Sequence, residues 1–190
     1  MQTKTVVGSG YTALIIVDVQ KDFCKRGALE VPDGDAVVPY INMMSGDEAY
    51  ARKYASRDCH PPDTEHFKIW PVHCVQDTPG AQFHPQLDLT DTTIITKGQS
   101  QIDDGYSAFE GVTTDGVPLE QDLRANNVTN LDVVGLATDY CVKATAIDGA
   151  KRGFNVTVYL SSCRAANIKP DDGTNAIRAM EAAGVTIVRD

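Results

Sequence analysis

The sequence LDVVGLATDYCVKATAIDGAKRG, residues 131–153, contains a short apolar run, a bend and a segment with helical periodicity. Residues 131–136 are mostly apolar and include two adjacent valines, as expected for a central strand of a parallel sheet. Alanines then recur at helical spacings until Gly153, a residue type that often ends helices. Thr138 can cap this helix, and Asp139 adds favourable negative charge to its first turn. The stretch therefore predicts a buried strand followed directly by a helix.

Cys141 is the residue of this stretch with reactive chemistry. If Thr138 is the N-cap, Cys141 falls in the first helical turn, where unpaired N–H groups and the helix dipole favour a thiolate. Open α/β sheets place their chemistry at such a bend, at the carboxyl end of a strand. The alternative is a small core cysteine in an alanine-rich helix. Partners elsewhere in the chain must decide between the two.

Composition limits the classes of protein to which the chain can belong. The 190 residues predict a single domain, residues 1–190, with 42% hydrophobic and 23% charged residues. A net charge of −9 argues against a nucleic-acid or anionic-membrane surface. No apolar run approaches the ~20 residues that cross a bilayer. The first residues lack a signal-peptide pattern, and five scattered cysteines suggest a reducing compartment, so we expect a cytoplasmic protein.

Strands and helices alternate along the rest of the chain. Short apolar or β-branched runs predict further strands at residues 13–17, 93–96, 155–160 and 185–188. Helical spacing of apolar residues predicts helices at residues 35–46, 118–127 and 172–183. Residues 50–56 have a poor strand composition and are assigned to a strand only from their place in the alternation. This order predicts a single α/β domain.

Two charged residues follow predicted buried strands. Asp18 closes the run at residues 13–17, and Lys97 closes the run at residues 93–96. A turn aspartate and a solvated lysine are the ordinary interpretations, although a buried carboxylate is costly unless it is paired. In a parallel sheet with adjacent strands, both would emerge on the same rim as Cys141. Acid, base and nucleophile would then share one crevice.

The segment RDCHPPDTEHFKIWPVHCV, residues 57–75, concentrates possible metal ligands. Within 16 residues it brings together the carboxylate of Asp58 and three of the four histidines of the chain, His60, His66 and His73. Such donors suit Zn²⁺, Fe²⁺ or Mn²⁺, and the prolines favour a loop that wraps around an ion.

Other interpretations of this segment remain open. It can be a polar surface loop with ordinary histidines. Cys59 and Cys74 can contribute to a Cys/His zinc site, although neither belongs to a CxxC pair. His84, in the following loop, is expected to be a surface residue.

Five segments in order resemble the nicotinamidase/pyrazinamidase branch of the isochorismatase-like cysteine hydrolases. They are ALIIVDVQKDFC, RDCHPPDTEHF, WPVHCVQDTPGAQFHPQL, TKGQSQIDDGYSAFEG and VVGLATDYCVKATAIDGAKRGF. The resemblance runs from Ala13 to Phe154. It implies a single-domain, three-layer α/β/α fold with a six-stranded, mainly parallel sheet.

The resemblance also implies a catalytic triad of Cys141, Asp18 and Lys97. Asp18 would take the thiol proton, Lys97 would hold Asp18 and help keep the thiolate anionic, and Cys141 would attack a carboxamide carbon. The oxyanion would be stabilised by the backbone N–H groups of Ala137 and Cys141, next to a cis peptide bond between Leu136 and Ala137.

A metal site and a ring-binding pocket are implied as well. One divalent ion, Zn²⁺ in first place and Fe²⁺ or Mn²⁺ otherwise, would be bound by Asp58, His60, His66 and His73. It would receive the pyridine nitrogen of the substrate. The flat ring would lie between the pocket walls Phe23, Trp70 and Tyr106. The sequence departs from the usual pattern of this family at two points near the metal ligands. Only six residues separate His66 from His73, and Cys59 stands where an aromatic residue is common.

The resemblance therefore predicts hydrolysis of nicotinamide to nicotinate and ammonia, in NAD salvage, with pyrazinamide as a second substrate. Another amidase of the same superfamily is the alternative, but such enzymes usually lack the cluster of metal ligands. A non-catalytic zinc-binding or redox-sensing module is a third possibility, against which the scatter of the cysteines argues. The oligomeric state remains open.

Overall fold

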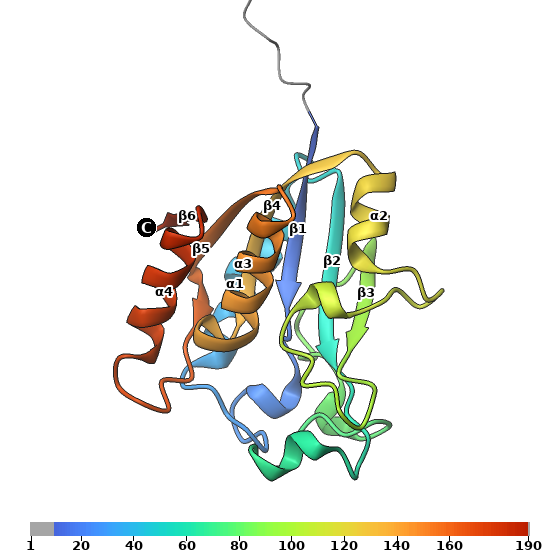
Figure 1. Ribbon diagram of the computed structural model, residues 1–190, viewed down its shortest axis with the longest axis vertical. Helices are drawn as coiled ribbons and strands as arrows, with labels where there is room; N and C mark the ends of the chain where they lie inside the picture. Colours follow the sequence, from blue (N-terminus) through green and yellow to red (C-terminus); the bar gives the residue numbers. More distant parts are fainter. Residues whose placement is uncertain (1–9, 190) are drawn as a thin grey trace, which may run out of the picture.

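The structure, a computed structural model, describes residues 10–189. Within these residues, six strands form one sheet in the order β3-β2-β1-β4-β5-β6, and all five pairs of neighbours are parallel (Figure 1). The strands are β1 Tyr11–Val17, β2 Arg52–Asp58, β3 Thr92–Lys97, β4 Val128–Leu136, β5 Asn155–Arg164 and β6 Thr186–Val188. The helices are α1 Val38–Ser45, α2 Leu119–Ala125, α3 Lys143–Lys151 and α4 Asp172–Ala182. The prediction of an α/β fold with a six-stranded sheet is confirmed, and the sheet is wholly parallel.

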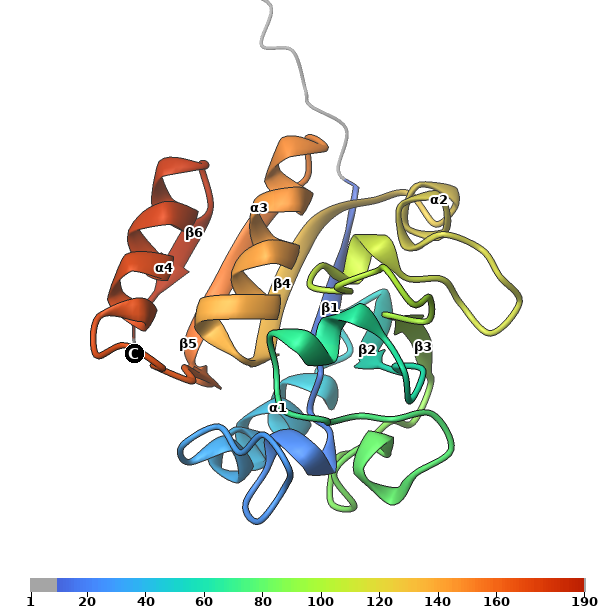
Figure 2. The same ribbon diagram turned by 60° about the horizontal axis from the view of Figure 1, so that its bottom comes forward.

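Strand β1 is buried on both faces of the sheet, which explains its continuous apolar sequence. On one face, Ile15 and Val17 belong to a core that includes side chains of α2, α3 and α4. On the other face, Leu14 and Ile16 belong to a second core that includes Ile41 of α1. The sheet therefore lies between two helical layers, as Figure 2 shows.

Element boundaries differ from the predictions in two places. The helix predicted at residues 35–46 begins as a 3₁₀ turn, Gly34–Val37, and becomes α-helical only at Val38. Pro39 follows in the first α-helical turn, where its missing N–H costs no hydrogen bond. The strand predicted at residues 50–56 lies two residues later, at β2, and its middle residues are fully buried despite the polar composition.

Strands β1 and β4 are neighbours at the point where the order of the strands reverses. From β1 the chain adds β2 and β3 on one side, and it then returns to add β4, β5 and β6 on the other side. Open α/β sheets bind ligands outside the carboxyl ends of the strands at such a switch point. The predicted site residues lie at this end of the sheet.

The predictions for the first nine residues lie outside the described part of the chain. Between residues 10 and 189, none of the helices combines the length and the apolar character needed to cross a bilayer.

Candidate active site

The bend after β4 presents the thiol. The peptide bond between Leu136 and Ala137 is cis, and residues Thr138–Val142 form a π-helical turn that leads into α3. The turn is closed by a hydrogen bond from the Val142 N–H to the Ala137 carbonyl at 3.1 Å. The prediction that Thr138 caps the helix is wrong, because Ala137 is the N-cap and its side chain makes no capping bond. The i→i+5 hydrogen bond makes this turn wider than an α-helical turn, which spacing alone does not reveal.

Four chemically active side chains converge at the carboxyl ends of four neighbouring strands. Lys97 Nζ lies 2.8 Å from Asp18 Oδ2, 2.5 Å from Asp58 Oδ1 and 3.7 Å from Cys141 Sγ. It also donates a hydrogen bond to the Gly105 carbonyl at 2.5 Å. The lysine and both carboxylates are buried, so each charge lies next to an opposite charge in a dry environment.

Burial controls the protonation states of this group. Burial raises the pKa of the Cys141 thiol well above its usual range, and the ammonium of Lys97 opposes this without overcoming it. Burial likewise raises the pKa of Asp18, which the Lys97 ion pair only partly offsets. Burial would lower the pKa of Lys97, but Asp18 and Asp58 hold it well above its usual range. Both shifts favour a neutral thiol next to Asp18, whereas the helix N-terminus considered from the sequence favours a thiolate.

The three histidines of residues 57–75 lie together, with one nitrogen of each within 4.8 Å of the others. Each Nδ1 faces an oxygen: Gly98 O for His60 at 3.1 Å, Asp104 Oδ1 for His66 at 3.0 Å and Pro71 O for His73 at 2.7 Å. Because a carbonyl or carboxylate oxygen only accepts, each Nδ1 carries a proton, and in the neutral ring Nε2 is then the nitrogen with a free lone pair. This is the tautomer that binds a metal ion through Nε2.

The histidine cluster fits a divalent metal ion. His60 Nε2 is buried and has no hydrogen-bond partner among the described residues, a state that is costly unless something binds there. Asp58 Oδ2 lies 3.8 Å from this nitrogen, so its free oxygen can join the imidazoles as a ligand. Burial lowers the pKa of His73, which favours the neutral ring that a metal needs. These donors suit Zn²⁺ and related ions.

The alternative prediction of a Cys/His zinc site does not match the structure. Within residues 10–189, the cluster that contains His60, His66 and His73 includes no cysteine. Cys74 is fully buried in the apolar core that includes Leu14 and Ile16, and Cys59 is only partly buried.

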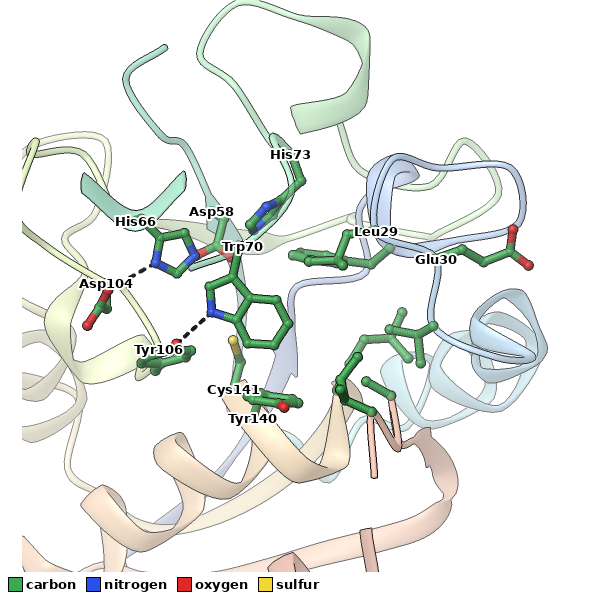
Figure 3. Close-up of a pocket in the computed structure, with 16 residues that line it drawn as sticks. Leu29, Glu30, Asp58, His66, Trp70, His73, Asp104, Tyr106, Tyr140 and Cys141 are labelled. Carbon is green, nitrogen blue, oxygen red and sulfur yellow. Dashed lines mark hydrogen bonds and ion pairs between the residues drawn. The ribbon is translucent and has the colours of Figure 1, made fainter. Parts of the chain in front are cut away.

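One pocket connects the thiol and the histidines. Figure 3 shows Cys141 below Trp70, with His66 and His73 above. The lining includes the three predicted wall residues Phe23, Trp70 and Tyr106, together with Leu136, Ala137 and Tyr140. Trp70 Nε1–H donates to the Tyr106 hydroxyl at 2.8 Å, which fixes the angle of both rings. The pocket is therefore lined by aromatic rings and extends between a thiol and a nitrogen-rich cluster.

Sequence reasoning missed three residues that shape this site. Tyr140 packs edge-on against Trp70, with ring centroids 4.8 Å apart, and its position next to the nucleophile was the available signal. Gln20 is buried and exchanges hydrogen bonds of 2.8 Å with both the N–H and the carbonyl of Asp58, so it holds that backbone in place. Asp104 contacts His66 from a loop whose sequence gives no signal of this contact.

The prediction that His84 is a surface residue is wrong. Its side chain is only 12% exposed and lies 3.2 Å from Asp35 Oδ1. It therefore ties its loop to the turn that precedes α1.

Comparisons with known proteins show which proteins this chain resembles over nearly its whole length. The isochorismatase domain model matches residues 12–189. The nicotinamidase/pyrazinamidase of Mycobacterium tuberculosis is 40% identical over 185 residues, covering 93% of this chain and 97% of that protein. The pyrazinamidase of Pyrococcus horikoshii, solved in complex with zinc, is 40% identical with a TM-score of 0.83 and coverage of 94% and 99%. The PnC1 protein of L. infantum, solved in complex with nicotinate, is 34% identical with a TM-score of 0.86 and coverage of 96% and 94%.

Proposed function

The chain belongs to the isochorismatase domain family, and we propose that it is a nicotinamidase, an amidohydrolase that converts nicotinamide to nicotinate and ammonia. The observation that carries this proposal is the shared pocket: Cys141, the aromatic walls and two of the three clustered histidines all line it. A thiol at one end can attack a carboxamide, while the other end can hold the ring that carries it.

Asp18 acts as the proton carrier of the reaction. Its raised pKa makes it a stronger base than an ordinary carboxylate, so it can take the proton of Cys141 as Sγ attacks the carbonyl carbon. The backbone N–H groups of Ala137 and Cys141 stabilise the oxyanion. Asp18 then returns the proton to the amide nitrogen, the C–N bond breaks, ammonia leaves, and a thioester remains on Cys141.

Hydrolysis of the thioester completes the cycle. Asp18 takes a proton from the water that attacks the thioester carbon, and the C–S bond breaks to release the carboxylic acid. The sulfur recovers its proton from Asp18, which restores the starting state. Lys97 remains charged throughout and forms ion pairs with both Asp18 and Asp58.

Asp58, His60, His66 and His73 are proposed to hold one divalent ion, with Zn²⁺ favoured by the donor set and by the zinc complex of the Pyrococcus horikoshii relative. When bound, the ion supplies a Lewis-acidic position for the pyridine nitrogen. Phe23, Trp70 and Tyr106 then hold the ring between them. Pyrazinamide carries the same carboxamide on a similar flat ring, and we propose it as a second substrate.

We propose that hydrolysis of nicotinamide by this enzyme serves NAD salvage. The described cysteines are all free, which supports a reducing compartment such as the cytoplasm. Residues 1–190 are proposed to form one domain, and the partner is a small molecule.

The deciding experiment measures ammonia release from nicotinamide by the wild type and by Cys141→Ala. Cys163→Ala is the matched control, because Cys163 is also a buried free thiol but does not line the pocket. We expect activity to fall at least about 10³-fold in Cys141→Ala and to persist in Cys163→Ala. Activity that survives in Cys141→Ala would exclude the mechanism, and no activity in the metal-loaded wild type would point to a different amide.

A further inference from the structure

The three clustered histidines differ in what holds them. His60 and His73 each donate Nδ1–H to a neutral backbone carbonyl, whereas His66 donates to the carboxylate of Asp104 at 3.0 Å. We propose that Asp104 is a positioning residue for the metal site, which fixes His66 with Nε2 directed to the ion and strengthens it as a ligand. This inference rests on the metal site of the proposed function.

Asp104 is itself held in place before any ion binds. The preceding residue, Asp103, accepts the Gly105 N–H at 2.9 Å, and the Gly105 carbonyl accepts a hydrogen bond from Lys97. A capping box between Ser107 and Glu110 closes the next turn of the same loop. The loop is therefore anchored on both sides of Asp104. This anchoring pre-organises the carboxylate for its contact with His66.

The loop also joins the metal site to the rest of the pocket. Three consecutive residues have three different tasks: Asp104 contacts His66, Gly105 contacts Lys97, and Tyr106 accepts the hydrogen bond of Trp70. Figure 3 shows Asp104 on the side of His66 that is opposite Asp58 and Trp70. Asp104 thus contacts His66 from the edge of the same pocket, where its side chain is 53% exposed.

A charged partner has a different effect from a neutral one. A carboxylate holds the proton on Nδ1 more firmly than a carbonyl does, because the acceptor is ionised. It also makes the imidazole a better electron donor and adds negative charge close to a divalent cation. Loss of such a partner typically weakens metal binding by about 10- to 100-fold.

The test compares Asp104→Ala and Asp104→Asn with the wild type. The Asn side chain still offers an oxygen to Nδ1–H but has no charge, whereas Ala removes both. Asp63→Asn is the matched control, because Asp63 is an exposed carboxylate that contacts Gln101 and no histidine. The dissociation constant for Zn²⁺ is measured by competition with a chromophoric chelator. We expect weakening of about 10- to 100-fold for Ala, a smaller loss for Asn and no change for Asp63→Asn.

Two further measurements separate positioning from general stability. The Asp104 side chain is 53% exposed, so the melting temperature of the metal-free protein should not change in either variant. Long-range ¹H–¹⁵N correlation spectra of the metal-free protein should show the Nδ1–H form of His66 in the wild type and a mixture of tautomers in Asp104→Ala. A lower melting temperature with unchanged metal affinity would show a merely structural role and overturn the inference.

Failure of this inference can be distinguished from failure of the proposed metal site. If the wild type binds no Zn²⁺, the metal site of the proposed function is wrong, and the inference falls with it. If the wild type binds Zn²⁺ and both Asp104 variants bind it equally well, the inference alone is wrong.

Discussion

Lys97 Nζ lies 2.5 Å from Asp58 Oδ1, and both side chains are buried. The second oxygen of Asp58 lies 3.8 Å from His60 Nε2. One carboxylate therefore connects the charged group around the thiol with the histidine cluster. A change of charge at Lys97 therefore affects the histidine cluster through Asp58, and a change of charge at the histidines affects Lys97 in the same way.

Replacement of Lys97 by Met should remove activity and stability together. Asp18 and Asp58 would remain buried without their common cation, so one of them must take up a proton. We expect ammonia release to fall by at least about 10²-fold and the free energy of unfolding to fall by ~3–5 kcal/mol. Urea unfolding of metal-free protein measures the second effect. Lys151→Met, at the exposed end of α3, should change neither quantity.

Gly98 has a backbone that only glycine adopts easily and lies against a metal ligand. Its φ is +66°, and a Cβ there would lie 2.6 Å from His60 Cε1. Gly98→Ala should displace the ring and weaken Zn²⁺ binding by about 10-fold or more. Gly116→Ala is the control, since φ is +79° there and nothing lies within 4 Å of the added Cβ. Equal metal affinity in both variants would contradict the role assigned to His60.

The hydrogen bond between Trp70 and Tyr106 should affect substrate binding more than chemistry. Tyr106→Phe keeps the ring but removes the oxygen that accepts Trp70 Nε1–H at 2.8 Å. Because neither side chain contacts the charged group, we expect KM for nicotinamide to rise about 3- to 10-fold with little change in kcat. Steady-state kinetics with saturating metal tests this. A fall in kcat at constant KM would place Tyr106 in the chemical step.

Asp35 should make the stability of the protein depend on acid pH. Burial would raise the pKa of this carboxyl, but hydrogen bonds from the Lys25 N–H and from His84 lower it below its usual range. Ionised Asp35 therefore stabilises the folded state above about pH 4, and this contribution is lost as the pH falls further.

The effect of Asp35→Asn on unfolding should accordingly be larger at pH 7 than at pH 3. Urea unfolding at the two pH values provides the measurement, with the exposed Asp115→Asn as the control. An effect of equal size at both values would show that charge on Asp35 does not contribute.

The sequence predicts those parts of the fold that depend on burial. The runs that became β1 and β4 are apolar because they are buried in the centre of the sheet, and the run that became β3 is β-branched and partly buried at its edge. Hydrophobic pattern reports this burial directly. Asp18, Lys97 and Cys141 follow these runs, so a parallel sheet alone brings their positions to one edge. The geometry agrees with that reasoning, because Lys97 contacts both other side chains.

Other features depend on tertiary contacts that local sequence does not encode. The polar strand β2 is specified by its neighbours, which pair with it on both sides. The π turn at Thr138–Val142 replaces the expected cap because the bend must fit between β4 and α3. Asp104 joins His66 only because its loop folds back over 38 positions of the chain, and no spacing rule anticipates such a contact.

The order of the strands has a consequence for biosynthesis. β1, β2 and β3 pair with one another in the order in which a ribosome makes them, whereas β4 adds later on the free side of β1. Asp18, Asp58 and Lys97 therefore lie at the carboxyl ends of three strands that are all synthesised before Cys141. Cys141 is the last of the four converging side chains to be synthesised, and its place in the group depends on the pairing of β4 with β1.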